Sequence, residues 1–283
     1  DPTNADHFLR LALEEDLGDA GDITSSAVIP EGTNAQAHIV ARAPGIIAGL
    51  EVMLRTFTIV DPEIHTESLV EDGTLVEADS LLAIVTGPAR SLLAAERVAL
   101  NLLGQLSGVA TATRELVDQI SGTSAALVDT RKTVPGLRGL QKAAVLAGGG
   151  QNHRMGLYDA VLIKDNHIAV AGSVEAAVQQ AHAAVGPDTT IEIEVESTEQ
   201  LEAAIAAGAD IVMLDNMSVD EMREAVVLTD GRCRTEASGG ITIATIREVA
   251  KTGVDMISVG WITHSAPALD VALDLEYLGP ESI

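Results

Sequence analysis

The second half of the chain repeats one pattern of apolar and polar positions. After residue 123, short and almost entirely apolar runs alternate with longer amphipathic stretches. Such short runs are typical of strands buried on both faces, and the amphipathic stretches are typical of the helices that cover them. The pattern predicts strands at 125–130, 160–165, 190–195, 210–215, 234–239 and 255–260, with helices at 173–185, 197–208, 218–228 and 242–253. We therefore expect parallel βα units in an α/β fold.

Polar side chains and glycines follow each of these predicted strands. They are Asp129 to Lys132, Lys164 to Asn166, Glu194, Asp215 to Asn216, Ser238 to Gly240, and Gly260. In a barrel such strand ends meet at one mouth, where barrel enzymes have their active sites. The alternative, an open doubly wound sheet, would spread them along an edge. Because six strands are clear in the sequence and a complete barrel has eight, we predict an incomplete (β/α) barrel.

The first part of the chain lacks this alternation. Its pattern predicts a helix at 6–17, a loop at 18–26, a strand at 35–41, a helix at 51–60 and a long helix at 89–120. We therefore assign 1–107 to a separate N-terminal α+β domain and 108–268 to the barrel. A last short helix is expected at 270–277, within a C-terminal segment 269–283.

Composition and charge limit the possible partners. The chain has 283 residues and a formal net charge of −25, which argues against binding to nucleic acid or to an anionic membrane surface. No apolar run is long enough to span a bilayer, and the first residues do not resemble a signal peptide. A single cysteine, Cys233, excludes an internal disulfide and fits a reducing compartment, so we expect a cytoplasmic protein.

One segment reverses the overall charge. Between Arg131 and Lys164 the sole acid is Asp159. The basic residues of this segment are Arg131, Lys132, Arg138, Lys142, Arg154 and Lys164. A solvated basic face could account for them. However, these cations lie among Gly, Asn and His at loop positions, where a scaffold presents binding groups. We therefore predict a pocket for a small ligand with several negative charges.

The arginines suit a dicarboxylate, because a guanidinium can bind a carboxylate through two parallel hydrogen bonds and an ammonium cannot. Arg131, Arg154 and Arg97 are candidates for this grip, with single hydrogen bonds from Lys132 and His153. Two simpler roles stay open: a supporting histidine at position 153, and a salt bridge between Arg97 and Glu96. Arg138 and Lys142 lie in a helical stretch away from any strand end, so we expect them to have supporting roles.

Two acids at strand ends, Glu194 and Asp215, are candidate ligands for a hard cation such as Mg²⁺, directly or through water. Pairing with a neighbouring Lys or Arg is the alternative. Glu192 and Glu196 share the alternation phase of Glu194, and from the pattern it is the strand-end position that distinguishes Glu194 from them.

Two glycine-containing turns follow the last two predicted strands and could bind a phosphate through backbone N–H groups. The candidate residues are Ser238, Gly239, Gly240, Ser258 and Gly260. His264 follows closely and could add a hydrogen bond from its imidazole.

These segments resemble the signature of the quinolinate phosphoribosyltransferase family. The similarity lies in TRKTVPGLRGLQKAAVLAGGGQNHRMGLYDAVLIKDNH, EIEVES, IVMLDNM, EASGGI and SVGWITHS, and it covers nearly the whole chain. The resemblance implies transfer of phosphoribosyl from phosphoribosyl pyrophosphate to quinolinate with loss of CO₂, and it implies Mg²⁺ as cofactor. It also implies a barrel fold and a C-terminal segment that packs on the first domain.

The resemblance also assigns roles to the candidate residues. Quinolinate would contact Arg97, Thr130, Arg131, Lys132, His153 and Arg154. Phosphoribosyl pyrophosphate would contact Lys164, Asn166, Glu194, Asp215, Ser238, Gly239, Gly240, Ser258, Gly260 and His264. Lys132, Lys164, Glu194 and Asp215 would act in catalysis. The family further implies a homodimer or a higher even oligomer in which Arg97 reaches the partner's site. A same-fold relative acting on another acceptor, such as a molybdenum-linked protein, and a non-catalytic anion-binding barrel are the alternatives.

Overall fold

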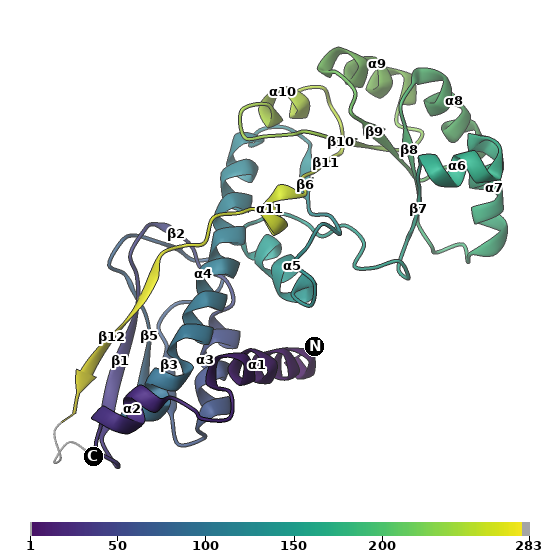
Figure 1. The fold of residues 1–283 in the computed structure, drawn as a ribbon. Coiled ribbons are helices and arrows are strands. Elements are labelled where there is room, and N and C mark those ends of the chain that lie inside the picture. The colour runs from purple at the N-terminus through teal and green to yellow at the C-terminus, as the bar shows by residue number, and fades with distance from the viewer. Residues whose placement is uncertain (1, 279–283) are drawn as a thin grey trace. The chain divides into compact units, whose positions relative to one another are not determined.

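The computed structural model describes residues 2–278 of the chain (Figure 1). The chain divides into two compact units. The first comprises residues 1–112, 146–149 and 266–283, and the second comprises 113–145 and 150–265. Helix α4 (Ala89–Gln119) passes from the first unit into the second.

The first unit contains an antiparallel sheet with helices. Its sheet has the strand order β12 (Val271–Tyr277), β1 (Asn34–Ala41), β5 (Leu81–Pro88) and β3 (His65–Ser68). The remaining elements are α1 (Pro2–Leu17), α2 (Ile23–Val28), α3 (Leu50–Val60) and the short pair β2 (Gly45–Ile46) with β4 (Leu75–Val76). The core is aliphatic around Phe57 and includes Ile39, Leu82 and Leu103, as the low aromatic content requires. The predicted elements 6–17, 35–41, 51–60 and 89–120 are confirmed.

Two predictions for this unit were wrong in part. The expected C-terminal helix at 270–277 is strand β12, which pairs antiparallel with β1 from Ala41↔Val271 to Ala35↔Tyr277. Val271, Leu273 and Leu275 alternate with Ala272, Asp274 and Glu276, a period of two that fits a strand. In addition, the expected loop at 18–26 contains the start of α2, which Asp22 caps by accepting the N–H groups of Thr24 and Ser25.

The second unit is built on a parallel six-stranded sheet. The strand order is β6 (Ala126–Val128), β11 (Met256–Ser258), β10 (Arg234–Ser238), β9 (Ile211–Asp215), β8 (Ile191–Val195) and β7 (Val161–Ile163). All of the strands predicted from the sequence are present. The first strand of this unit pairs with the last rather than with the next one, which is the pairing of a barrel that is open between β6 and β7. The incomplete barrel is therefore confirmed, and a doubly wound sheet is not found among the described residues.

The helices of this unit follow from local sequence. They are α5 (Arg138–Ala147), α6 (Asp165–Ala171), α7 (Val174–Ala184), α8 (Thr198–Ala207), α9 (Val219–Thr229), α10 (Ile246–Ala250) and α11 (Trp261–His264). Ser173, Ser197 and Ser218 each cap a helix by accepting the backbone N–H three residues on. Such caps satisfy N–H groups that a helix start leaves unpaired; they fix where α7 begins after α6, and where α8 and α9 begin after β8 and β9.

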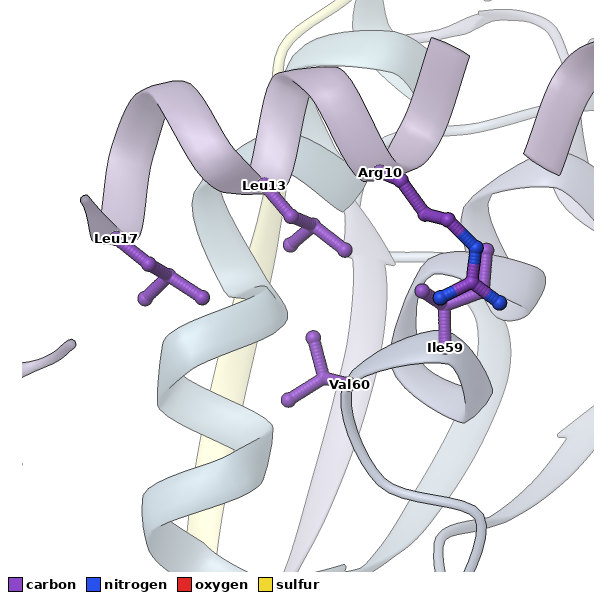
Figure 2. Close-up of a pocket in the computed structure, with 5 residues that line it drawn as sticks. All are labelled: Arg10, Leu13, Leu17, Ile59 and Val60. Carbon is purple, nitrogen blue, oxygen red and sulfur yellow. The ribbon is translucent and has the colours of Figure 1, made fainter. Parts of the chain in front are cut away.

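Two further features of the described residues bear on function. None of their helices is both long and apolar enough to cross a bilayer. A shallow surface pocket in the first unit is lined by Arg10 together with Leu13, Leu17, Ile59 and Val60 (Figure 2). One guanidinium among aliphatic side chains cannot neutralise a ligand with several negative charges, so this pocket does not fit the predicted substrates.

Candidate active site: an anion pocket at the barrel mouth

The ends of β6 and β11 lie side by side and form one part of the mouth. The backbone N–H of Lys132 donates to the Thr130 hydroxyl at 3.0 Å, and the Thr263 hydroxyl donates to the Lys132 carbonyl at 2.7 Å. A Cβ added to Gly260 would lie 2.8 Å from the Lys132 side chain and 3.3 Å from the Thr130 hydroxyl oxygen. Position 260 therefore has to be small for Thr130 and Lys132 to lie where they do.

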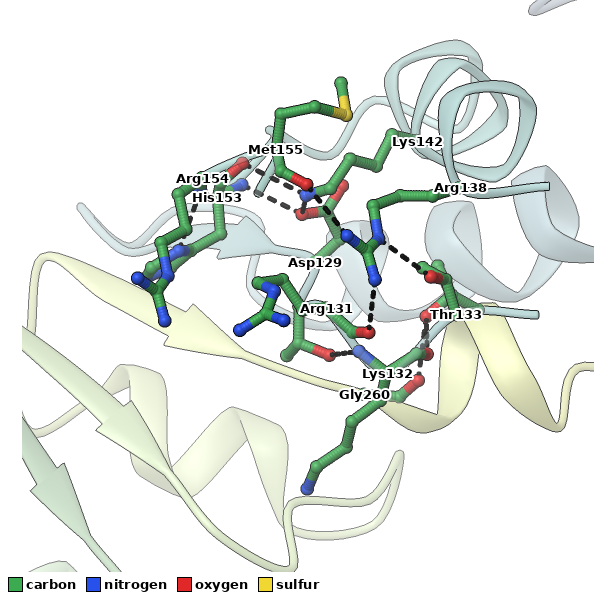
Figure 3. A network of polar contacts seen from close by, with 12 residues as sticks. Asp129, Arg131, Lys132, Thr133, Arg138, Lys142, His153, Arg154, Met155 and Gly260 are labelled. Carbon is green, nitrogen blue, oxygen red and sulfur yellow. Dashed lines mark hydrogen bonds and ion pairs between the residues drawn. The ribbon is translucent and has the colours of Figure 1, made fainter. Parts of the chain in front are cut away.

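Arg131 and Arg154 form a pair of neighbouring cations. Burial lowers the pKa of Arg154, and the positive charge of Arg131 lowers it further. The Nε–H groups of both arginines are buried and have no hydrogen-bond partner among residues 2–278. Figure 3 shows the two guanidinium groups on the same side of a polar network. Repelling cations with unused buried donors are suited to a ligand that carries more than one carboxylate.

A buried ion pair supports this basic segment. Lys142 on α5 contacts Asp129, which directly follows β6, and both side chains are completely buried. The Lys142 ammonium also donates to the His153 carbonyl at 3.0 Å, and Asp129 accepts the His153 N–H at 2.9 Å (Figure 3). Burial raises the pKa of Asp129 and outweighs the lowering effect of Lys142. The supporting role expected for Lys142 is confirmed.

Arg138 also has the supporting role that its position predicted. Its guanidinium donates to the Thr133 hydroxyl at 3.0 Å and to the Met155 carbonyl at 3.2 Å. These bonds join the segment that follows β6 to the segment that follows α5. Arg138, Lys142 and Asp129 thereby connect separate parts of the long segment that links β6 to β7.

His153 lies among acids that the sequence pattern did not single out. Its Nε2 is 2.9 Å from Glu192 and 3.4 Å from Glu236, and both carboxylates are buried. Burial lowers the pKa of His153, but the two carboxylates outweigh this effect and raise it to about 10. The Nδ1 atom accepts the Arg154 N–H at 2.8 Å, and this contact opposes a second ring proton. The raised pKa alone would give an imidazolium with both nitrogens protonated, but Nδ1 cannot carry a proton while it accepts the Arg154 N–H; the hydrogen-bond geometry therefore assigns the ring one proton, on Nε2 beside Glu192.

Glu194 and Asp215 lie together at the ends of β8 and β9. The Lys164 ammonium donates to Glu194 at 2.6 Å, so the alternative of pairing with a neighbouring cation holds for Glu194. Burial raises the pKa of Asp215, and the charge of Glu194 raises it further. Two repelling carboxylates at an exposed mouth have the oxygen chemistry of a Mg²⁺ site, and their mutual repulsion is what a divalent cation would relieve. The arrangement fits such an ion.

The turns after β9 and β10 pack against each other. Asn216 has φ 54° and its N–H donates to the Ser238 carbonyl at 3.0 Å. Gly239 has φ 100°, and a Cβ at this position would collide with the Asn216 side chain and lie 3.0 Å from its backbone nitrogen. Gly240 has φ 62° and nothing within 4 Å of its Cβ position. Glycine is therefore required at 239 for close packing against Asn216, whereas the space beside Gly240 is open to a ligand.

The remaining candidate residues are Asn166, Ser258, His264 and Arg97. The exposed side chains of Asn166 and His264 lie after β7 and β11, and His264 bonds to the Ser265 hydroxyl at 2.6 Å. The buried Ser258 hydroxyl is directed to the Ala237 carbonyl at 3.5 Å. Arg97 lies in the first unit on α4, with its side chain 63% exposed and 3.4 Å from Glu96. The pairing of Arg97 with Glu96 is thus present, and it is a weak contact.

Comparison with known proteins decides the family. The models of the C-terminal and N-terminal domains of quinolinate phosphoribosyl transferase match residues 109–274 and 22–107. The chain belongs to the quinolinate phosphoribosyltransferase family. A probable carboxylating nicotinate-nucleotide pyrophosphorylase of Bacillus subtilis is 45% identical over 95% of this chain and 92% of its own length. The carboxylating pyrophosphorylase of Mycobacterium leprae is 45% identical over 94% of this chain and 95% of its own.

Solved structures of this family have the same fold. The crystal structure of NadC from Streptococcus pyogenes superposes with a TM-score of 0.94 at 41% identity and covers 98% of each chain. The nicotinate-nucleotide pyrophosphorylase of Francisella tularensis gives a TM-score of 0.93 at 41% identity, covering 97% of this chain and 96% of its own. The family resemblance found in the motifs is confirmed, and the chain is an enzyme of this family.

Proposed function

We propose that this family member transfers the phosphoribosyl group of phosphoribosyl pyrophosphate to quinolinate, with release of pyrophosphate and CO₂, to form nicotinate mononucleotide in NAD biosynthesis. The observation that carries the proposal is the Arg131–Arg154 pair, whose Nε–H donors are buried and unpaired within residues 2–278. Quinolinate has two adjacent carboxylates and can satisfy both guanidinium groups. Thr130 and Lys132, which are held against Gly260, are placed to add further hydrogen bonds.

The other half of the mouth suits the sugar phosphate. The open backbone at Gly240, directly after the packed Gly239, supports binding of the 5-phosphate through N–H groups. Lys164 holds a positive charge beside Glu194, where it can neutralise the leaving pyrophosphate. Glu194 and Asp215 would hold Mg²⁺, directly or through water, and would position the ribose. When bound there, Mg²⁺ would supply charge neutralisation for the pyrophosphate.

The residues support displacement without a covalent enzyme intermediate. The pyridine nitrogen of quinolinate attacks the anomeric carbon of the ribose as the bond to pyrophosphate breaks, through a transition state with oxocarbenium character. The carboxylate next to the nitrogen then leaves as CO₂, the electron pair left on carbon is stabilised by the quaternised nitrogen, and that carbon takes up a proton from solvent to give nicotinate mononucleotide. Lys132 is the cation we assign to this step. The half-buried Cys233 has its pKa raised by burial, so it is poorly suited to act as a nucleophile.

We also propose a homodimer, or a higher even oligomer, in which Arg97 acts in the partner's site. The proposal is supported by the exposed Arg97 side chain and its long contact to Glu96. An isologous interface would supply this arginine twice, once to each mouth. We assign the enzyme to the cytoplasm, as the composition suggests.

The test is binding and turnover with both substrates. Calorimetry should show quinolinate binding, and mixing with phosphoribosyl pyrophosphate and Mg²⁺ should release pyrophosphate. Arg131→Ala or Arg154→Ala should weaken quinolinate binding by about 2–5 kcal/mol and should weaken nicotinate binding far less, because nicotinate lacks the 2-carboxylate. Arg223→Ala on α9 is the control, since Arg223 pairs with Asp220 on the helix surface.

The same measurements separate the alternatives. A relative that uses another acceptor would release pyrophosphate with that acceptor and not with quinolinate. A non-catalytic anion-binding barrel would bind the substrates without releasing pyrophosphate. Equal losses of quinolinate and nicotinate binding in the arginine variants would refute the dicarboxylate assignment.

A further inference from the structure

His153 has both ring nitrogens engaged inside the protein. Nε2 lies 2.9 Å from Glu192 and 3.4 Å from Glu236, and Nδ1 accepts the backbone N–H of Arg154 at 2.8 Å. The three side chains form a compact group, with ligand-type atoms all within 4.8 Å of one another. The orientation of this ring is therefore fixed from both edges, and one edge is fixed by the backbone that carries Arg154.

The two carboxylates are poor choices for stability alone. Glu192 is 2% exposed and Glu236 is completely buried. One oxygen of Glu192 and both oxygens of Glu236 have no hydrogen-bond partner within the described part of the chain. Buried charges with unsatisfied oxygens are costly, and apolar side chains of similar size are often at least as stable. A costly arrangement of this kind, next to the arginine pair, points to a role in function.

We propose that Glu192 and Glu236 are positioning residues of the dicarboxylate site. They hold the proton of His153 on Nε2, so that Nδ1 remains an acceptor for the Arg154 N–H and fixes the point where the Arg154 side chain leaves the backbone. The inference rests on the proposed function, because Arg154 is assigned there to the substrate. The opposite side of the same segment is held by Asp129, which accepts the His153 N–H at 2.9 Å.

A metal site and a counter-charge role both account less well for the group of His153, Glu192 and Glu236. A divalent cation could bind the same three side chains, but Nε2 is already directed at Glu192, and the guanidinium of Arg154 lies in the field of Glu192. A pure counter-charge role would also place acids near arginines. With a pure counter-charge role, removing the negative charge of Glu192 or Glu236 should strengthen the binding of the anion quinolinate. The positioning role predicts weaker binding.

The test compares Glu192→Gln and Glu236→Gln with Glu224→Gln, a surface control on α9 that removes the same charge. Each glutamine keeps the shape of the side chain but can turn an amide N–H toward Nε2. We expect quinolinate affinity to fall about tenfold in the first two variants, with the KM for phosphoribosyl pyrophosphate unchanged. The control should bind quinolinate like the unmodified enzyme.

A second measurement determines which ring nitrogen of His153 carries the proton. In ¹⁵N NMR of histidine-labelled protein, the His153 ring should carry its proton on Nε2 in the unmodified enzyme and should shift toward the Nδ1-protonated form in the variants. A role limited to stability would not move this signal. The signal can be assigned by its loss in His153→Gln.

The proposed function and the positioning role of Glu192 and Glu236 are refuted by different results. If the unmodified enzyme does not bind quinolinate, the proposed function fails and this inference fails with it. If it binds quinolinate but both glutamine variants bind equally well or more tightly, the inference alone is wrong. An unmodified enzyme with the His153 proton on Nδ1 would also overturn the inference, whatever the variants do.

Discussion

The sharpest energetic prediction concerns the buried pair of Lys142 and Asp129. Lys142→Met removes the ammonium and keeps most of the volume of the side chain. Asp129 then remains completely buried without its counter-ion. Removing one member of a buried ion pair costs about 3–5 kcal/mol, because the other charge stays uncompensated. At about 2–4 °C per kcal/mol for a unit of this size, the melting temperature should fall by about 6–20 °C.

The loss of stability caused by Lys142→Met should also depend on pH. Burial already raises the pKa of Asp129 in the folded protein, and the loss of Lys142 removes a charge that opposes this shift. An acid with a raised pKa binds more protons folded than unfolded, so the free energy of unfolding decreases as the pH rises above about 3.9. The destabilisation by Lys142→Met should therefore be larger at pH 8 than at pH 5.

Urea and thermal unfolding of the full chain at both pH values provide the assay. The matched control is Lys142→Met combined with Asp129→Asn, which leaves no charge buried and should recover part of the loss. The reasoning is refuted if the single variant loses less than about 1 kcal/mol, or if the double variant is no more stable than the single one.

Three further predictions address the site itself. Gly239→Glu should weaken phosphoribosyl pyrophosphate binding and spare quinolinate binding, because the side chain meets Asn216 and adds a negative charge beside the 5-phosphate; calorimetry with each ligand checks this. Chelation should abolish pyrophosphate release, Mg²⁺ should restore it, and Asp215→Asn should impair turnover in a protein that unfolds normally; full activity in chelator would contradict the metal assignment. Arg97→Ala and Lys164→Ala should each be nearly inactive, and after mixing they should recover about a quarter of the normal rate if subunits exchange and a dimer shares its sites; no recovery despite exchange would rule out a shared site.

Much of the barrel could be predicted because its information is local. Strands such as β7 and β9 are short apolar runs, and β8 and β9 are followed by turns whose serine caps the next helix. The same pattern places Lys164, Glu194 and Asp215 at strand ends, and the contacts between them agree with that placement. Strand β12 could not be distinguished from a helix, because a seven-residue stretch with mixed apolar positions fits either period. Its pairing with β1 is a contact between distant parts of the chain.

The buried acids could not be selected in the same way. Alternation shows that Glu192 and Glu194 lie on the same face of β8, but it does not show their depth in the barrel. Glu192 is buried against His153, whereas Glu194 lies near the mouth with Lys164. For Glu192 the available signal was an acid between the isoleucines of β8, whereas Glu236 lies in the largely polar sequence Arg-Thr-Glu-Ala-Ser of β10 and carries no such signal. Such an acid needs a partner, and the partner can be identified only from the fold.

The pairing of β12 with β1 also bears on synthesis at the ribosome. Strand β1 is made early, but its neighbour on one edge is residues 271–277, which follow the whole six-stranded unit in the chain. During translation, the second unit can thus complete its sheet before the first unit can. Until the last strand emerges, one edge of β1 has unpaired N–H and C=O groups that can pair with another chain. Strand β1 is therefore synthesised early, yet it stays open to pairing with a wrong chain until the last strand has been made.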